Sequence, residues 1–426
     1  MLSFLEHSCP IAKDSPVHQA TRVCYEKHSE SESFKEIFRA FSWLKDLTQS
    51  PEKYHIAHGG SETAKQHWLH HQNSLSCECI LINGKYEPFL SQLPEGVLSM
   101  SLRDAHSVFS TFIQRYDVDT QPLAFLNAVC SQEEGVVIYI PEEFQVSELL
   151  SIRHISFPTS QDDRMIYSPK IILILGKQSS CSVQISHHTE RESGVAESFA
   201  IINGVTEVFV SEGAELSLTM LPKYINEERI SWSHIATIEE QGACSIAQQL
   251  LEDAGGYGWF DNTFSMIGNN SHGESLVSAL SPRKTWVRNL MHHDAESTTS
   301  RQNIKSILYS GHFLFEGGIH VTSRGMFTDA YQKHDTLLLN DNARVTTFPR
   351  LEIFTDDVKA SHGATVGPLD AQQIFYMQSR GMTREEAQKK LVRGFLSIES
   401  SLEHFPKLSM RMQSQEVTKE YSIDGM

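Results

Sequence analysis

The sequence predicts a mainly β protein, with a central β-rich region between two helical segments. Three observations support this: an amphipathic helical pattern near the start, short apolar runs separated by turn residues from about residue 135, and two well-capped helical segments near the end. Short strands without helical periodicity fit a β-sandwich or a parallel β-helix. Turns of an acidic residue, glycine and alanine recur before apolar strands and favour the β-helix, while their irregular spacing leaves the sandwich open.

Residues 1–134 are predicted to form a mainly helical N-terminal domain. Apolar residues recur at three- and four-residue steps from Phe34 to Leu47, as in an amphipathic helix, and Pro51 ends the pattern. Residues 102–125 are a second predicted helical segment. Between them, residues 79–84 predict a strand that enters a tight turn, because the dipeptide Asn83-Gly84 favours positive backbone angles.

Residues 135–367 are predicted to form the β core. Turn residues such as Glu212-Gly213 and Asp341-Asn342 separate its apolar runs. The predicted strands are residues 136–140, 170–176, 181–186, 204–210, 214–221, 243–251, 312–321 and 335–340.

Residues 368–426 are predicted to form a C-terminal helical domain. Asp370 is placed to cap a helix over residues 371–380, with Gln373 as its reciprocal partner, and Gly381 is placed to end that helix. Thr383 and Glu386 form a capping box for a second helix. The apolar stripe of the second helix is Ala387, Leu391, Phe395, Ile398 and Leu402.

Composition and charge narrow the classes of function. The net charge of −17 argues against a general nucleic-acid binder, which carries a basic face. No apolar run approaches the roughly 18 residues of a membrane helix, and the first residues lack the pattern of a signal peptide. We therefore expect a cytoplasmic protein with no membrane partner.

Cysteines and histidines are the candidate metal ligands. The seven cysteines are odd in number and scattered, which favours reduced thiols over a disulfide framework, and none follows Cys244. Cys77 and Cys79 lack the second pair that zinc and cluster sites commonly use, so core packing is the favoured interpretation. His292, Asp294 and Glu296 would share one face of an extended strand and form a hard-ion site, although a polar surface is favoured.

The segment Asp356 to Gly367, DDVKASHGATVG, carries the last candidates. His362 follows the last predicted strand, where a neutral imidazole could ligate a transition metal or act as a base; the alternative, favoured by the residues alone, is a turn at a domain boundary. Asp356 and Asp357 suggest a polysaccharide-cleaving β-helix enzyme, but adjacent acids point apart. No nucleotide-binding or hydrolase motif is present, so a scaffold or binding protein is favoured over an enzyme.

Long stretches of the C-terminal half resemble a known family. The segment GHFLFEGGIHV, residues 329–382 and especially the block from Leu351 to Gly367 closely resemble the SufB/SufD family of iron–sulfur cluster assembly proteins, as do residues 80–97 and 293–300 more loosely. The resemblance is dense over residues 290–400. It implies a right-handed parallel β-helix flanked by N- and C-terminal helical domains, in a non-catalytic subunit of a cytoplasmic complex with a SufB-like subunit and a SufC-like ABC ATPase.

The resemblance also implies sites. It assigns a metal- or cluster-associated role to His362 at the junction with SufB. The strands that would pair with SufB carry Leu337, Leu339, Leu351 and Ile353, and the helices that would dock SufC carry Phe375, Tyr376, Arg380, Gly381 and Phe395. ATP hydrolysis by SufC would strain the helical domains and open the junction to iron and sulfide.

Within the family the chain resembles SufD more than SufB. A SufB-type scaffold needs a cysteine near the β-helix end, where this chain has Ala343 and no later thiol. Many relatives carry cysteine two residues before the histidine, where this chain has Ala360, so His362 would act without a local sulfur. The chain alone is expected to bind no cofactor stably, with transient iron or a cluster at the SufB interface; flavin binding has no residue pattern here. Two alternatives stay open: a self-sufficient homodimeric scaffold and a β-helix carbohydrate-active enzyme.

Overall fold

The computed structural model describes most of the chain from residue 77 to residue 396. The described residues are 8–10, 19, 46–47, 49–57, 77–105, 107–109, 112, 116, 121–131, 134–157, 164–190, 200–222, 228–251, 257–280 and 284–396.

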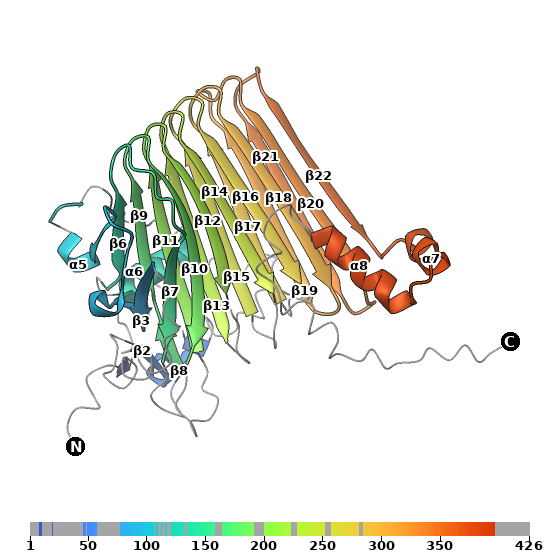
Figure 1. Cartoon of the computed structure of the whole chain (residues 1–426), viewed down its shortest axis with the longest axis horizontal. Helices are drawn as coiled ribbons and strands as arrows, with labels where there is room; N and C mark the ends of the chain where they lie inside the picture. Colours follow the sequence, from blue (N-terminus) through green and yellow to red (C-terminus); the bar gives the residue numbers. More distant parts are fainter. Residues whose placement is uncertain are drawn as a thin grey trace.

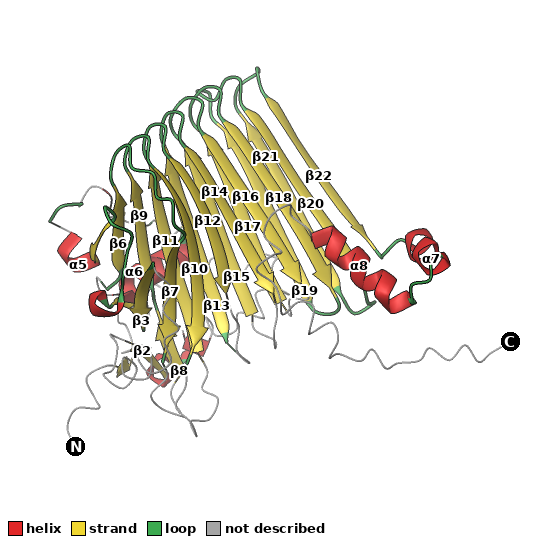
Figure 2. Ribbon diagram, in the orientation of Figure 1, coloured by secondary structure: helices red, strands yellow, loops and turns green. Residues whose placement is uncertain are grey.

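The chain folds as a parallel β-solenoid built of two long sheets (Figures 1 and 2). From β10 onward, consecutive strands alternate between the sheets, and each strand pairs in parallel with the strand two positions later. Sheet A contains β1 (Ser8–Pro10), β2 (Tyr54–Ala57), β5 (Leu98–Ser101), β6 (Val136–Ile140), β8 (Arg164–Tyr167), β9 (Lys170–Leu175), β11 (Ala200–Val210), β13 (Arg229–Ile238), β15 (Tyr257–Met266), β17 (Lys284–His293), β19 (His312–Val321) and β21 (Arg344–Ile353). Sheet B contains β3 (Glu78–Ile82), β4 (Lys85–Tyr86), β7 (Leu150–Ser156), β10 (Ser180–Thr189), β12 (Glu215–Pro222), β14 (Ala243–Leu251), β16 (His272–Leu280), β18 (Thr299–Leu308), β20 (Asp329–Leu338) and β22 (Lys359–Gly367). Parallel pairing selects the β-helix over the sandwich, which is antiparallel.

One coil takes about 28 residues in the middle of the solenoid, from Ile201 to Arg229 and from Arg229 to Tyr257. The coil corners follow a repeated geometry at one side of the solenoid, the upper side in Figure 1. At each corner a residue with positive φ donates its N–H to a carbonyl of the next coil, as Gln241 does to Asn269 (2.9 Å). The connections at the other side vary in length, which explains the irregular turn spacing of the sequence.

The solenoid interior is packed with alternating side chains from both sheets. Phe260, Phe264, Phe313 and Phe315 are fully buried there, together with short polar files. In one such file, Asn262 forms hydrogen bonds to the neighbouring coils on both sides. Strand β15 therefore places a polar residue inside the core. Buried amides of this kind are tolerated because they bond to one another.

The N-terminal region contributes strands to both sheets as well as helices. The predicted strand at residues 79–84 is confirmed as β3 and its turn, with φ of 53° at Asn83 and 94° at Gly84. β3 pairs in parallel with β7, and β2 with β8, which the sequence did not predict. Described helical elements are η2 (Pro51–Lys53), η3 (Pro88–Leu90), α5 (Leu102–Ala105) and α6 (Pro122–Ser131). Of the predicted helix from Phe34 to Leu47, only the last two residues lie within the described part.

Two helices follow the last strand, α7 (Ala371–Ser379) and α8 (Arg384–Leu396). The caps at Asp370 and Thr383 are confirmed: Asp370 accepts a hydrogen bond from the backbone N–H of Gln372 (2.8 Å), and the Thr383 N–H donates to the Glu386 carboxylate (2.7 Å). The predicted reciprocal bond from Gln373 to Asp370 is not formed among the described residues. Gly381 has φ of 90°, as expected of a residue that ends a helix.

The buried stripe of α8 differs from the predicted one. Ala387 is buried as expected, but Val392 and Leu396 are the buried contacts with Ile307 of β18, while Leu391 and Phe395 are only half-buried. The buried residues lie one position later than predicted from Val392 onward, where α8 packs on the apolar cluster of Ile307, Leu337 and Leu339. Ile398 and Leu402 lie outside the described residues. None of the described helices combines the length and the apolar character needed to cross a bilayer.

Candidate functional site at the open end of the solenoid

The solenoid ends in two strands that are each paired on one side only. β21 pairs with β19 in sheet A, β22 pairs with β20 in sheet B, and no described strand pairs with their other edges. Figure 1 shows β22 as the outermost strand of the fold. Such edges present rows of unpaired N–H and C=O groups, which proteins normally protect or use for pairing with another chain. We call this end of the solenoid the open end.

The strand register identifies the side chains that face the interior at the open end. Residues paired in register share a face. Phe313 and Phe315 of β19 point into the core, so their partners on β21 point inward too. The inward residues of the last coil, which we call the mouth, are Val345, Thr347, Pro349, Leu351 and Ile353 of β21 and Ala360, His362 and Ala364 of β22.

His362 lies in the middle of β22 and not past the last strand, where the sequence analysis placed it. The segment that carries it, KASHGATVG, is rich in small residues and lacks an apolar signal, so its strand character was missed. His362 pairs with Gln332 of β20, is exposed, and has no hydrogen bond or ion pair to the residues that the structure describes. It is therefore an accessible imidazole at the rim of the solenoid interior.

Apolar side chains around the mouth are exposed in this chain. Ile353 is 37% exposed, Val366 is 48% exposed and Phe354 is 62% exposed. Leu351 is half-buried beside Ala360. An exposed apolar rim next to two unpaired strand edges is typical of a surface that another protein covers.

The donor set at the mouth fits only part of a metal or cluster site. Among the described residues, no three histidine, cysteine or acidic side chains are grouped closely enough to hold a metal ion. Five cysteines, Cys77, Cys79, Cys130, Cys181 and Cys244, are buried, and burial raises the pKa of the last three to about 12, so these thiols stay protonated. The mouth thus offers one imidazole, and any thiolate ligand would have to come from another chain.

The other candidate ligands are not brought together. Asp294 bonds to Thr322 (2.8 Å) and pairs with Arg324, while His292 contacts the ring of His320 at 5.6 Å between centroids. The hard-ion site, the less favoured interpretation of His292, Asp294 and Glu296, is not formed among the described residues, because β17 ends at His293 and the chain turns there. Asp356 and Asp357 are exposed in the corner between β21 and β22, where they belong to the solvent-facing surface.

A second exposed surface lies on α7. Phe375 is 73% exposed and Tyr376 is 59% exposed, while Ile374 is the buried residue of this helix. The Arg380 guanidinium lies 5.3 Å from the centre of the Tyr376 ring, and Gly381 follows in the turn to α8. Two neighbouring exposed aromatic rings and an arginine are the residue types that dominate binding surfaces.

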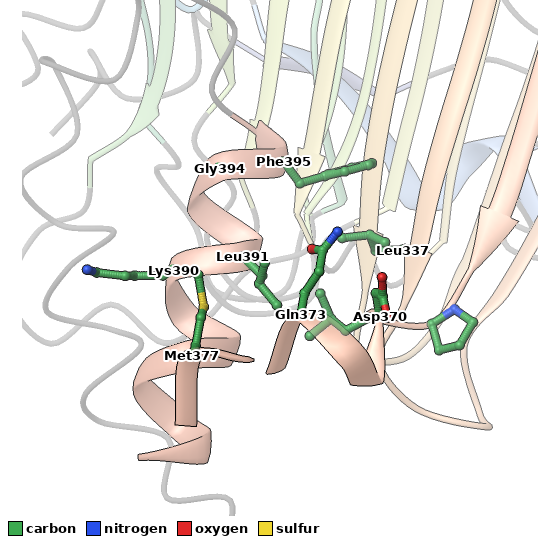
Figure 3. A pocket seen from close by; sticks show the side chains of 10 residues that line it. Leu337, Asp370, Gln373, Met377, Lys390, Leu391, Gly394 and Phe395 are labelled. Carbon is green, nitrogen blue, oxygen red and sulfur yellow. The ribbon is translucent and has the colours of Figure 1, made fainter. Parts of the chain in front are cut away.

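A pocket of about 500 Å³ lies between this helix pair and the end of sheet B (Figure 3). Leu337 of β20 lines it, and Phe395 of α8 lies 5.7 Å from the Lys305 ammonium group. Leu339 packs in the same apolar cluster beneath α8. Leu337 and Leu339 therefore lie away from the open edge, whereas Leu351 and Ile353 lie at the mouth with His362.

The sequence did not indicate Thr347 and Pro349 as residues of the mouth, nor Gln332 as the residue one coil beneath His362. The signal that could have found them is the coil length: His362 follows Gln332 by one coil in sheet B.

Comparison with known proteins identifies relatives. A family model described as "SUF system FeS cluster assembly, SufBD core domain" matches residues 157–395. "Protein ABCI7, chloroplastic" of Arabidopsis thaliana is 28% identical over 293 residues, which cover 67% of this chain and 60% of the relative. "Iron-sulfur cluster assembly protein SufD" of Escherichia coli (strain K12) is 37% identical over 132 residues, covering 31% of this chain and 30% of the relative.

A third relative, "Iron-sulfur cluster assembly protein SufD" of Bacillus subtilis (strain 168), is 23% identical over 317 residues, covering 71% of this chain and 69% of the relative. For the first two relatives the similarity spans less than two thirds of their own length.

Proposed function

Because this chain belongs to the SUF-system iron–sulfur cluster assembly family with a SufBD core domain, we propose that it is a non-catalytic SufD-like subunit of a cluster assembly complex. In this proposal it pairs with a SufB-like subunit through the open end and docks a SufC-like ATPase through its C-terminal helices. Iron and sulfide, or the nascent cluster, are cargo at the junction and not a resident cofactor. The observation that carries the proposal is the uncovered open end with one accessible imidazole.

Two features support pairing with a thiol-bearing partner. The unpaired edges of β21 and β22 can extend both sheets into another solenoid, which would bury the exposed Ile353 and Val366. The mouth carries His362 but no cysteine, and Ala343 occupies the turn before β21. A neutral imidazole and a thiolate from the partner would together form a suitable donor set for iron.

The family also supports finer expectations about the fold. We propose that the solenoid winds right-handed, as parallel crossovers almost always do. We further propose a helical domain at each end, with the divisions 1–134, 135–367 and 368–426. The described helices α6, α7 and α8 fall within the two terminal parts. Location in the cytoplasm is likewise a proposal.

The direct test of this function is co-expression of the full chain with SufB- and SufC-type subunits. We expect a stable complex whose mass, measured by native mass spectrometry, includes this chain. A chain that purifies alone and binds a cluster without SufB would favour the homodimeric scaffold instead. Turnover of a polysaccharide by the purified chain would favour the enzyme alternative.

His362→Ala is expected to lower cluster formation on the complete complex by at least about tenfold, because the mouth has no second ligand to replace the imidazole. Cluster formation is followed by the absorbance of the assembled cluster under reducing conditions. The matched control is His320→Ala, since His320 lies on the outer face of sheet A and, among the described residues, bonds to an exposed carboxylate alone, that of Glu352 (3.1 Å). Unchanged cluster formation in His362→Ala would contradict the proposed metal- or cluster-associated role of His362.

The double variant Phe375→Ser and Tyr376→Ser is expected to weaken binding of the SufC-type ATPase by at least about tenfold. Both rings are exposed, so their loss should leave the unfolding temperature of the chain unchanged. Binding is measured by isothermal titration with the purified ATPase. If the affinity stays within twofold of the original, docking does not use this face of α7.

A further inference from the structure

The interior of the solenoid contains a file of polar side chains that ends at His362. Ser275, Gln302, Gln332 and His362 occupy the same register position on β16, β18, β20 and β22. The first three are buried, with exposed fractions of 0%, 0% and 1%. His362 is the exposed member because no described strand covers β22. The residue directly beneath the candidate site is therefore a buried amide.

A glycine on the opposite sheet, Gly317, makes room for the Gln332 amide. A Cβ atom built at Gly317 of β19 would lie 2.3 Å from Nε2 and 2.6 Å from Oε1 of Gln332. The amide thus occupies the space that a side chain at position 317 would need. One coil deeper, Gln302 donates from Nε2 to the carbonyl of Gly318 (3.1 Å). Both amides therefore reach across the interior toward β19.

The Oε1 atom of Gln332 is buried and accepts no hydrogen bond from the residues that the structure describes. Buried acceptors are normally satisfied, so this atom calls for a donor. Adjacent strands lie about 4.8 Å apart, so a rotation of the inward side chain at the same position of the next coil can bring a polar atom within hydrogen-bonding distance. The inward side chain at this position of the next coil is His362.

We infer that Gln332 is a positioning residue for His362: on rotation of the exposed imidazole, which bonds to no described residue in the structure, the ring N–H donates to Oε1 of Gln332. A neutral imidazole carries one N–H and one lone pair, so fixing the N–H selects the tautomer and directs the lone pair of the other nitrogen. In that arrangement the lone pair would be on the nitrogen away from Gln332, on the side of the mouth. Metal-binding histidines are commonly oriented by such a second hydrogen bond. The inference rests on the proposed role of His362, but the hydrogen bond itself does not require that role.

The test compares histidine tautomers in full-length protein labelled with ¹⁵N-histidine. The signal of His362 is assigned by its disappearance in His362→Ala. Gln332→Met keeps the shape of the side chain but removes the acceptor, and we expect the two ring ¹⁵N shifts of His362 to change from one dominant tautomer toward a mixture. Gly317→Ala, which displaces the amide without removing it, is expected to have the same effect.

The matched control is Gln302→Met, one coil deeper in the same file, which should leave the His362 signals unchanged while perturbing the core similarly. Unaltered His362 tautomers in Gln332→Met, in a variant that retains its circular dichroism spectrum, would overturn the inference. This outcome is independent of the test of function. Cluster formation in His362→Ala tests the role of His362, whereas the His362 tautomer in Gln332→Met tests the positioning role of Gln332.

Discussion

Replacing Ile353 by lysine is expected to weaken pairing of this chain with a second solenoid by more than about 100-fold. Ile353 is the last inward residue of β21 and is 37% exposed, so the isolated chain can keep a charge there in water. In a continuous sheet across the junction, the same ammonium group would be buried among apolar side chains without a partner. Burying an unpaired charge costs several kcal/mol, and about 1.4 kcal/mol corresponds to a tenfold change in affinity.

The affinity of Ile353→Lys for a SufB-type subunit can be measured by analytical ultracentrifugation. Phe89→Lys is the control, because Phe89 is an exposed apolar residue (99%) far along the chain from the mouth. The Phe375 and Tyr376 double variant is a second control, since it should lose the ATPase and retain the solenoid partner. Full affinity of Ile353→Lys would show that the open end is not the pairing surface.

Acidification below about pH 6.5 is expected to destabilise the solenoid strongly. Burial lowers the pKa of His154, His234 and His293 to about 3, and that of His334 to about 4. In the unfolded chain these imidazoles take up protons as the pH falls through about 6.5, while in the folded chain they stay neutral. Their contribution is thus fully present above pH 6.5 and is lost progressively down to the folded pKa values.

The expected size of the acid effect is large. For each such histidine, the free energy of unfolding falls by about 1.4 kcal/mol per pH unit below the pKa of the unfolded chain. At pH 5 the loss is roughly 2 kcal/mol per histidine. Four of them together approach the total stability of a typical domain, about 5–15 kcal/mol. The histidines are neutral in the core because burial disfavours the charged imidazolium, and the neutral ring of His293 bonds to Thr298 (2.8 Å) and Ser300 (2.9 Å).

Urea unfolding midpoints measured between pH 7.5 and pH 5 test this prediction. We expect the midpoint to fall steadily below pH 6.5. His293→Gln keeps a hydrogen-bonding side chain without a titratable group. The unfolding free energy of this variant should therefore change with pH by about 1.4 kcal/mol per pH unit less than that of the original protein. A midpoint that does not change between pH 7 and pH 5 would contradict the assignment of these histidines as buried and neutral.

The elements that the sequence predicted best are those with complete local signals. The apolar runs at residues 136–140, 243–251 and 312–321 coincide with β6, β14 and β19. The caps formed by Asp370 and by Thr383 with Glu386 are also local, since each joins residues two or three positions apart. Such signals depend only on neighbouring residues and survive in any tertiary context.

The strands that were missed carry their information in other coils. β13, β15 and β17 place His234, Asn262 and Asn289 in the core, which interrupts the apolar alternation expected of a buried strand. These polar residues are stable inside only because the next coil supplies a bonding partner. β22 lacks an apolar pattern because its inward face has no coil above it, so small residues suffice.

The sequence by itself determined the family, the capped helices and a lone histidine in a C-terminal half without thiols. Only the tertiary structure decided that His362 faces the solenoid interior above Gln332, that Leu351 and Ile353 share its mouth, and that Leu337 lies beneath α8. The physical reason is the register between coils. It joins residues about 30 positions apart and is set by the lengths of the intervening loops and the packing of the core, neither of which is encoded in a local pattern.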